Sequence, residues 1–92
     1  MRVIVRDKAF ADIRRIAEFI ALESEAAARS VSHRILDAID DLENFPNRFA
    51  NGRAPNTRER QVSSLPYVIV YEPGTEERPT IILAVFHTAQ ER

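Results

Sequence analysis

A chain of 92 residues can build one hydrophobic core but not two, so we expect residues 1–92 to form a single domain. The formal net charge of −1 argues against a protein that holds nucleic acid through phosphates across its whole surface, because such proteins are clearly basic. The sequence has no cysteine, which excludes disulfides and thiolate zinc sites. The apolar run Val3–Val5 is too short for a signal peptide or a membrane span, and we expect a cytoplasmic protein.

The first half of the chain predicts a short strand and two helices. Val3–Val5 lies between arginines and predicts the strand. Asp7 stands where an N-cap carboxylate is favoured, and Ser24 offers a second N-cap. Proline disfavours helical geometry in the residue before it, so the second helix should end near Phe45, before Pro46. Apolar residues recur at helical spacing in both segments: Phe10, Ile13, Ile16, Ala17 and Ile20, then Val31, Ile35, Ala38, Ile39, Leu42 and Phe45.

The second half predicts a sheet. Residues 46–57 are rich in Pro, Asn and Gly and predict a loop, and residues 58–63 predict a weak strand. Tyr67–Tyr71 predicts a strong strand because every residue is β-branched or aromatic, and a turn at Pro73-Gly74 leads to a last strand over Ile81–His87. Strands joined by short turns pair antiparallel. The expected fold class is α+β, ordered β-α-α-β-β-β, with an N-terminal strand and a helical hairpin packed on a small antiparallel sheet.

One local cluster of positive charge stands out against the near-neutral total. Arg48, Arg53, Arg58 and Arg60 fall in a single segment that contains one acid, Glu59. Any contact with nucleic acid would have to rest on this cluster.

Several motifs follow each other in an order that resembles a known family. They are Gly52-Arg53, Thr57-Arg58-Glu59, Pro66-Tyr67-Val68-Ile69-Val70-Tyr71 and a closing strand that ends at His87. After two amphipathic helices, this order resembles the ParE branch of the RelE/ParE toxins, the toxin halves of bacterial toxin–antitoxin modules, also called plasmid stabilisation proteins. The resemblance covers nearly the whole chain. Arg60 departs from the pattern, because the family usually places an aliphatic residue there.

The resemblance implies two alternative activities. RelE-type members cut messenger RNA in the ribosomal decoding site, which requires a general base, a proton donor and cations around the phosphate. Here His87 would be the base or acid, Arg58 and Arg60 the phosphate clamps with Arg53 in support, and Glu59 an alternative base. ParE-type members have a similar shape but poison DNA gyrase and lack the ribonuclease residues.

The catalytic set is incomplete in this sequence. No lysine follows Lys8, no tyrosine follows Tyr71, and no tryptophan is present to stack on a base. His87 is better explained as the end of an apolar strand face, after Ile81, Leu83 and Val85. Tyr67 and Tyr71 share a strand face with Ile69, and we predict that both tyrosines lie in the core or in an interface.

We therefore predict a toxin of a type II toxin–antitoxin module that inhibits DNA gyrase by binding, and the alternative is a ribosome-dependent mRNA endonuclease. The resemblance implies a cognate antitoxin whose flexible segment covers Val68, Val70 and their neighbours, or the groove of the helical hairpin. We expect no metal site, no cofactor and no membrane contact, and the free protein could form a homodimer. The candidates for the functional surface are Arg53, Arg58, Arg60, His87 and Arg92.

Overall fold

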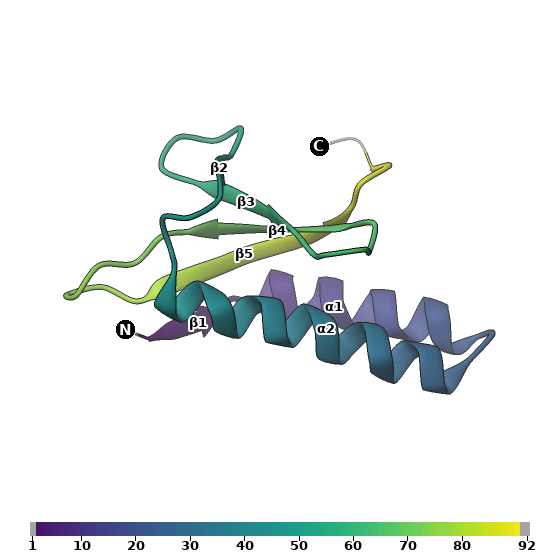
Figure 1. The fold of residues 1–92 in the computed structure, drawn as a ribbon. Coiled ribbons are helices and arrows are strands. Elements are labelled where there is room, and N and C mark those ends of the chain that lie inside the picture. The colour runs from purple at the N-terminus through teal and green to yellow at the C-terminus, as the bar shows by residue number, and fades with distance from the viewer. Residues whose placement is uncertain (1, 91–92) are drawn as a thin grey trace.

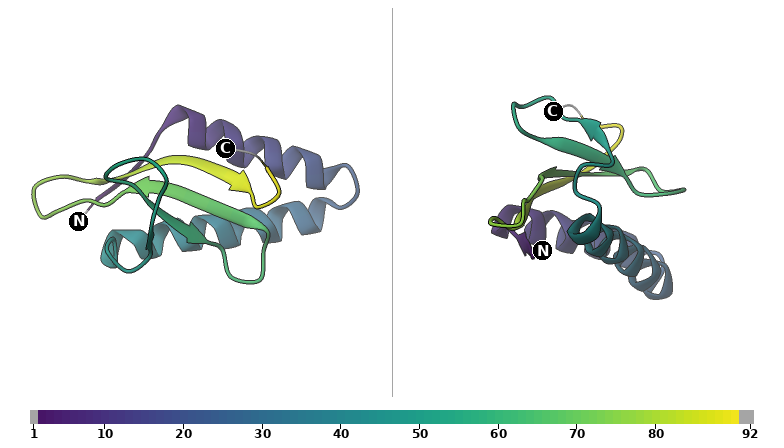
Figure 2. Two further views of the ribbon diagram at one scale, coloured as in Figure 1. Left: turned by 90° about the horizontal axis from the view of Figure 1, so that it is seen from above. Right: turned by 60° about the vertical axis from the view of Figure 1, so that its left-hand side comes forward.

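The computed structural model describes residues 2–90, which form two layers, an antiparallel helix pair and a twisted sheet (Figure 1). Both helices lie on one face of the sheet and leave the opposite face without a covering helix (Figure 2). This is the predicted α+β architecture. The elements are β1 (Val3–Val5), α1 (Asp7–Ala21), α2 (Glu25–Asn44), β2 (Ala50–Asn51), β3 (Arg58–Gln61), β4 (Tyr67–Glu72) and β5 (Thr80–His87).

The sheet contains two features that the sequence did not predict. Its five strands follow the order β1-β5-β4-β3-β2, and β1 pairs with β5 in parallel, so the sheet is mixed rather than wholly antiparallel. The connection between these two strands is long, since it contains the helical hairpin and β2, β3 and β4, and a long connection permits the parallel direction. The second feature is β2, a two-residue strand inside the predicted loop, where Ala50 lies opposite Glu59.

The helix starts and the helix faces agree with the prediction only in part. Ser24 caps α2 as predicted, because its Oγ accepts a hydrogen bond from the Ala27 amide at 3.0 Å. The prediction for Asp7 was wrong: Arg6 is the N-cap, and Asp7 is already the first helical residue. The predicted stripe on α1 also contains one error, since the side chain of Phe10 is 52% exposed. The helix is rotated so that Ala9, Asp12 and Ile13 are its buried residues.

The core lies between the helices and the sheet. Tyr67, Ile69 and Tyr71 of β4 are buried on one strand face, as predicted, and they belong to one cluster with residues of α2. The fully buried side chains with the largest volumes are Tyr71, Ile35, Leu42, Ile69, Ile82 and Thr80. None of the helices within the described residues is both long and apolar enough to cross a membrane.

A bulge in β5 changes which residues of that strand face the helices. Tyr71 lies opposite Ile82 while its neighbour Val70 lies opposite Ala84, so Leu83 is an extra residue without a partner on β4. Strict alternation therefore fails, and Ile82 and Val85 are the buried positions opposite Tyr71 and Ile69. The predicted grouping of Ile81 and Leu83 with Val85 on one face was wrong for this reason.

Candidate functional site

Strand β3 divides the predicted basic residues between the two faces of the sheet. Arg58 lies opposite Tyr71 and Arg60 opposite Ile69, so both arginines share the helix-facing side with these core residues. Glu59 lies opposite Val70, on the other face. The two proposed phosphate clamps and the proposed alternative base are therefore separated by the sheet.

Arg60 connects the sheet to the end of α2. Its Nη1 donates to the Ala38 carbonyl at 2.8 Å and to Asp41 Oδ2 at 3.1 Å. Its guanidinium carbon also lies 4.6 Å from the centroid of the Phe49 ring. The side chain is only 15% exposed. This explains how an arginine occupies an inward-facing strand position: its stem crosses the core edge and its head group finds partners on the helix.

The long loop between α2 and β3 is attached to the sheet at two places. Arg58 Nη1 donates to the Phe49 carbonyl at 2.6 Å, and the Tyr71 hydroxyl donates to the Pro46 carbonyl at 2.9 Å. Burial raises the pKa of the Tyr71 hydroxyl, although the nearby charges of Arg58 and Arg60 act in the opposite direction. Tyr71 is therefore a neutral donor that holds the loop, not a general base.

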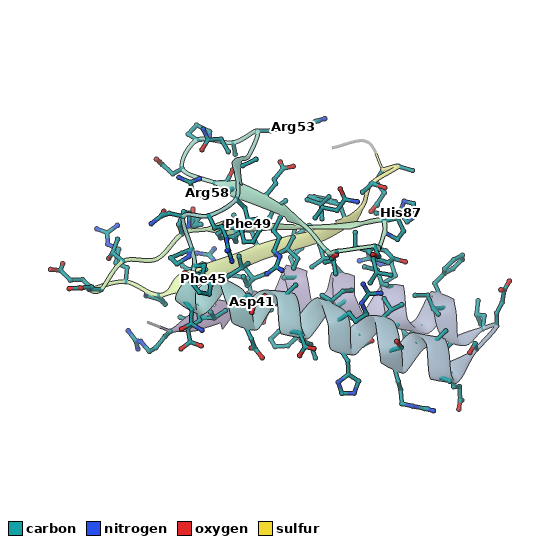
Figure 3. All side chains as sticks on the ribbon, in the orientation of Figure 1. Asp41, Phe45, Phe49, Arg53, Arg58 and His87 are labelled. Carbon is teal, nitrogen blue, oxygen red and sulfur yellow. The ribbon has the colours of Figure 1, made fainter. Side chains whose placement is uncertain are left out.

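His87 lies apart from the arginines, at the opposite end of the sheet from Arg58 (Figure 3). It is an exposed residue opposite Tyr67, and the two rings meet edge to face with centroids 5.5 Å apart. Its Nδ1 accepts a hydrogen bond from the Ala89 amide at 3.0 Å, which orders the turn after β5. The structure therefore gives His87 local structural contacts and no contact with the predicted clamps.

Arg53 lies at the tip of the loop between β2 and β3 (Figure 3), and its amide donates to Glu59 Oε2 at 3.3 Å. Together with Arg58 it lines an open polar hollow of ≈ 660 Å³ between this loop and the turn at residues 73–75. Arg53 and Arg58 are thus brought near each other, whereas His87 is not. Arg92, the remaining predicted surface residue, lies outside the described residues.

Sequence reasoning missed Asp12, a buried carboxylate on α1. Its side chain is 3% exposed, and Oδ2 accepts a hydrogen bond from the Val85 amide at 2.9 Å. The same carboxylate pairs with Lys8 at 2.9 Å and with Arg15 at 3.4 Å. Strand β1 pairs with β5 only as far as Ile82, so Asp12 binds an edge amide that no strand among the described residues reaches. The available sequence signal was the Lys8-Asp12-Arg15 spacing, which is also typical of a solvated helix surface.

The arrangement offers no assembled catalytic or metal centre among residues 2–90. No group of three or more His, Asp or Glu side chains in this part of the chain could hold a metal ion. Arg58 and Arg60 hold backbone carbonyls, Glu59 faces the other way, and His87 is remote. What the surface does offer is exposed apolar residues for contact with other proteins, mainly on the helical hairpin: Phe10, Phe19, Leu22 and Leu36.

Comparisons with known proteins agree with this fold. A family model described as "ParE toxin of type II toxin-antitoxin system, parDE" matches residues 3–92. A protein of Sinorhizobium fredii (strain NBRC 101917 / NGR234), named "Putative toxin Y4kP", is 34% identical over 76 residues, which is 83% of this chain and 76% of that protein. A solved structure, "Chromosomal ParDE TA system from P. aeruginosa", has a similar fold, with a TM-score of 0.81, 19% identity and coverage of 95% of both chains.

Proposed function

This chain belongs to the ParE toxin family of type II toxin–antitoxin systems, and we propose that it inhibits DNA gyrase by binding, without catalysing a reaction itself. The observation that carries this proposal is the dispersal of the residues that RNA cleavage would need. The proposal implies a cytoplasmic protein that works as one rigid binding module.

RNA cleavage requires a base, an acid and cations within reach of one phosphate, at hydrogen-bond distances of about 3 Å. Arg60 has its charge taken up by Asp41 and the Ala38 carbonyl, and Arg58 binds the Phe49 carbonyl. Glu59 lies on the other face of the sheet. A phosphate beside His87 would therefore lack the clamps, which favours a binding protein over a ribonuclease.

The proposal is tested with purified toxin in a gyrase supercoiling assay and in a translation reaction in which messenger cleavage is followed by primer extension. We expect loss of supercoiling and no ribosome-dependent cleavage. We further expect His87→Ala to inhibit gyrase within about twofold of the wild-type protein, because this exposed ring is held by local contacts with Tyr67 and the Ala89 amide.

The mRNA endonuclease is the competing outcome of the same assays. Rapid cleavage of ribosome-bound messenger that His87→Ala abolishes, together with unchanged supercoiling, would overturn the gyrase proposal. The fold of the variant is checked by circular dichroism, so that loss of activity is not confused with unfolding.

Membership of a ParDE toxin family implies an antitoxin partner. We propose that the antitoxin segment covers the face of the sheet that carries no helix (Figure 2). Val68 and Val70 are half-buried there, on the opposite strand face from Tyr67 and Ile69. An extended or helical segment with apolar residues would remove these side chains from water and form a third layer on the fold.

The antitoxin surface is tested with Val68→Asp, which introduces a charge on that face, and with Leu22→Asp as the matched variant on the helical hairpin. In isothermal titration with the antitoxin encoded beside the toxin, we expect Val68→Asp to weaken binding by about 100-fold, as at an interface hot spot. Leu22 is 82% exposed at the hairpin tip, and its variant should bind within about threefold of wild type. The reverse pattern would move the antitoxin to the apolar surface at the tip of the helical hairpin, where Leu22 and Phe19 line one pocket.

A further inference from the structure

Helix α2 carries a row of side chains on its outer surface, along the groove that it forms with α1. Arg29, His33, Leu36, Asp40 and Glu43 follow each other at intervals of four, three, four and three residues, and we name them the α2 stripe. This spacing keeps side chains on one side of a helix and is the spacing by which two long helices pack along each other. Arg29, His33 and Leu36 line the open groove between α1 and α2, and no other element of residues 2–90 lies over this outer side of the helical hairpin (Figures 1 and 2).

We propose that the α2 stripe is a self-association surface on which a second copy of this chain binds with its own α2 antiparallel. The two-fold axis passes beside Leu36. Such an isologous contact presents the same stripe from both copies, so every favourable pair occurs twice. This inference is independent of the gyrase proposal, because it concerns the toxin alone.

Charge complementarity selects the second copy as the occupant and fixes its direction. The stripe is basic before Leu36, at Arg29, and acidic after it, at Asp40 and Glu43. Arg29 and Glu43 each lie seven residues from Leu36, so an antiparallel copy places Arg29 opposite Glu43 of the second copy. A parallel copy would place acids opposite acids, which disfavours that direction.

The charges on the stripe are not used inside the molecule. On the other sides of α2, Asp41 pairs with Arg60 at 3.1 Å and Arg34 donates to the Ser63 carbonyl. Within residues 2–90, neither Arg29 nor Asp40 nor Glu43 has a hydrogen bond or an ion pair through its side chain. The acidic and basic groups of the stripe therefore remain available for a partner of the same composition.

An apolar contact lies at the centre of the stripe. Leu36 is 42% exposed and borders a shallow groove of ≈ 500 Å³ between α1 and α2. Because the two-fold axis passes beside Leu36, the Leu36 side chains of the two copies contact each other there and leave water together. The contact combines a small apolar centre with charged ends, which is typical of a weak, salt-sensitive dimer.

The test uses two reciprocal charge reversals in the toxin, Arg29→Glu and Glu43→Arg, with sedimentation equilibrium at low ionic strength as the measurement. The wild-type protein should dimerise with a dissociation constant in the micromolar range, roughly 1–100 μM, as for small interfaces. Each single variant should dimerise about tenfold or more weakly, because it places like charges opposite each other twice. The control, Arg14→Glu on α1, should dimerise like the wild-type protein.

Mixing the two single variants gives the decisive result. In a mixed pair, the carboxylate introduced at position 29 of one chain faces the guanidinium introduced at position 43 of the other. The unchanged Arg29 and Glu43 face each other at the opposite end, so heterodimers should form although each variant dimerises poorly alone. The double variant should dimerise like the wild-type protein.

Three outcomes would overturn the proposal. The first is a wild-type protein that stays monomeric at about 200 μM, and the second is a pair of single variants that fail to associate with each other. The third is a wild-type toxin that stays monomeric while the Arg29→Glu variant binds the antitoxin more weakly than the wild type does. This result would assign the α2 stripe to the antitoxin.

Discussion

Replacing Asp12 with alanine is expected to lower the free energy of unfolding by about 3 kcal/mol. The substitution leaves the buried Val85 amide without an acceptor and removes the partner of Lys8 and Arg15. The two cations are largely exposed and return to water, so most of the loss comes from the orphaned amide and the space left in the core edge. For a domain of this size the loss is a large part of the total stability, which is about 5–14 kcal/mol.

Urea unfolding followed by circular dichroism measures this effect. Asp12→Asn keeps an oxygen that can accept from the Val85 amide, so it should lose less, about 1–2 kcal/mol. Asp37→Ala is the matched control, because this exposed carboxylate of α2 has no hydrogen bond or ion pair within residues 2–90; it should change stability by less than about 0.5 kcal/mol. If Asp12→Ala unfolded at the same urea concentration as Asp37→Ala, the structural role of Asp12 would be wrong.

Replacing Gly74 with alanine is the second substitution with a large expected effect, a loss of about 2–3 kcal/mol. A Cβ at this position would lie 2.5 Å from the Thr80 amide nitrogen and 2.6 Å from the Arg78 carbonyl oxygen. Both atoms belong to the backbone of the turn and cannot rotate away. The shift would also disturb the hydrogen bond from the Gly74 amide to Thr80 Oγ1, which closes the β4–β5 connection.

Thermal unfolding of Gly74→Ala beside Glu76→Ala tests this requirement. Glu76 is exposed in the same turn, so its replacement should leave stability within about 0.5 kcal/mol of wild type. Equal melting temperatures for the two variants would contradict the prediction, because they would show that the turn backbone shifts at little cost to accept a Cβ at position 74. Gly74 has no positive φ, so the position does not require the backbone freedom of glycine. It requires a residue without a Cβ, because the neighbouring backbone leaves no space for one.

The sequence could predict which segments become helices and strands because local patterns carry that information. The β-branched and aromatic run Tyr67–Tyr71 and the cap at Ser24 are such patterns. The direction of β1 could not be predicted, since alternation of side chains defines the two faces of a strand and not the direction of its neighbour. The bulge at Leu83 was equally invisible, because it depends on how β5 aligns with β4.

The roles of individual polar residues were predicted less well than the fold. Arg58, Arg60 and Glu59 are adjacent in sequence and looked like one cluster, yet strand geometry sends them to opposite faces. Asp12 was not predicted at all, because its spacing from Lys8 and Arg15 is also typical of a solvated helix surface. Its true partner, the Val85 amide, is 73 residues away in sequence and becomes a neighbour only after folding.

The carboxylate of Asp12 also affects whether the edge of β5 can pair with a strand of another molecule. Within residues 2–90, β5 has no neighbouring strand on its β1 side beyond Ile82, and its sequence from Ile81 to Phe86 is entirely apolar. An apolar strand with an open edge is a template for fibril-like stacking between molecules. Helix α1 and its buried carboxylate occupy that edge, so the group that stabilises the fold also occupies a backbone donor that a strand from another molecule would need for pairing.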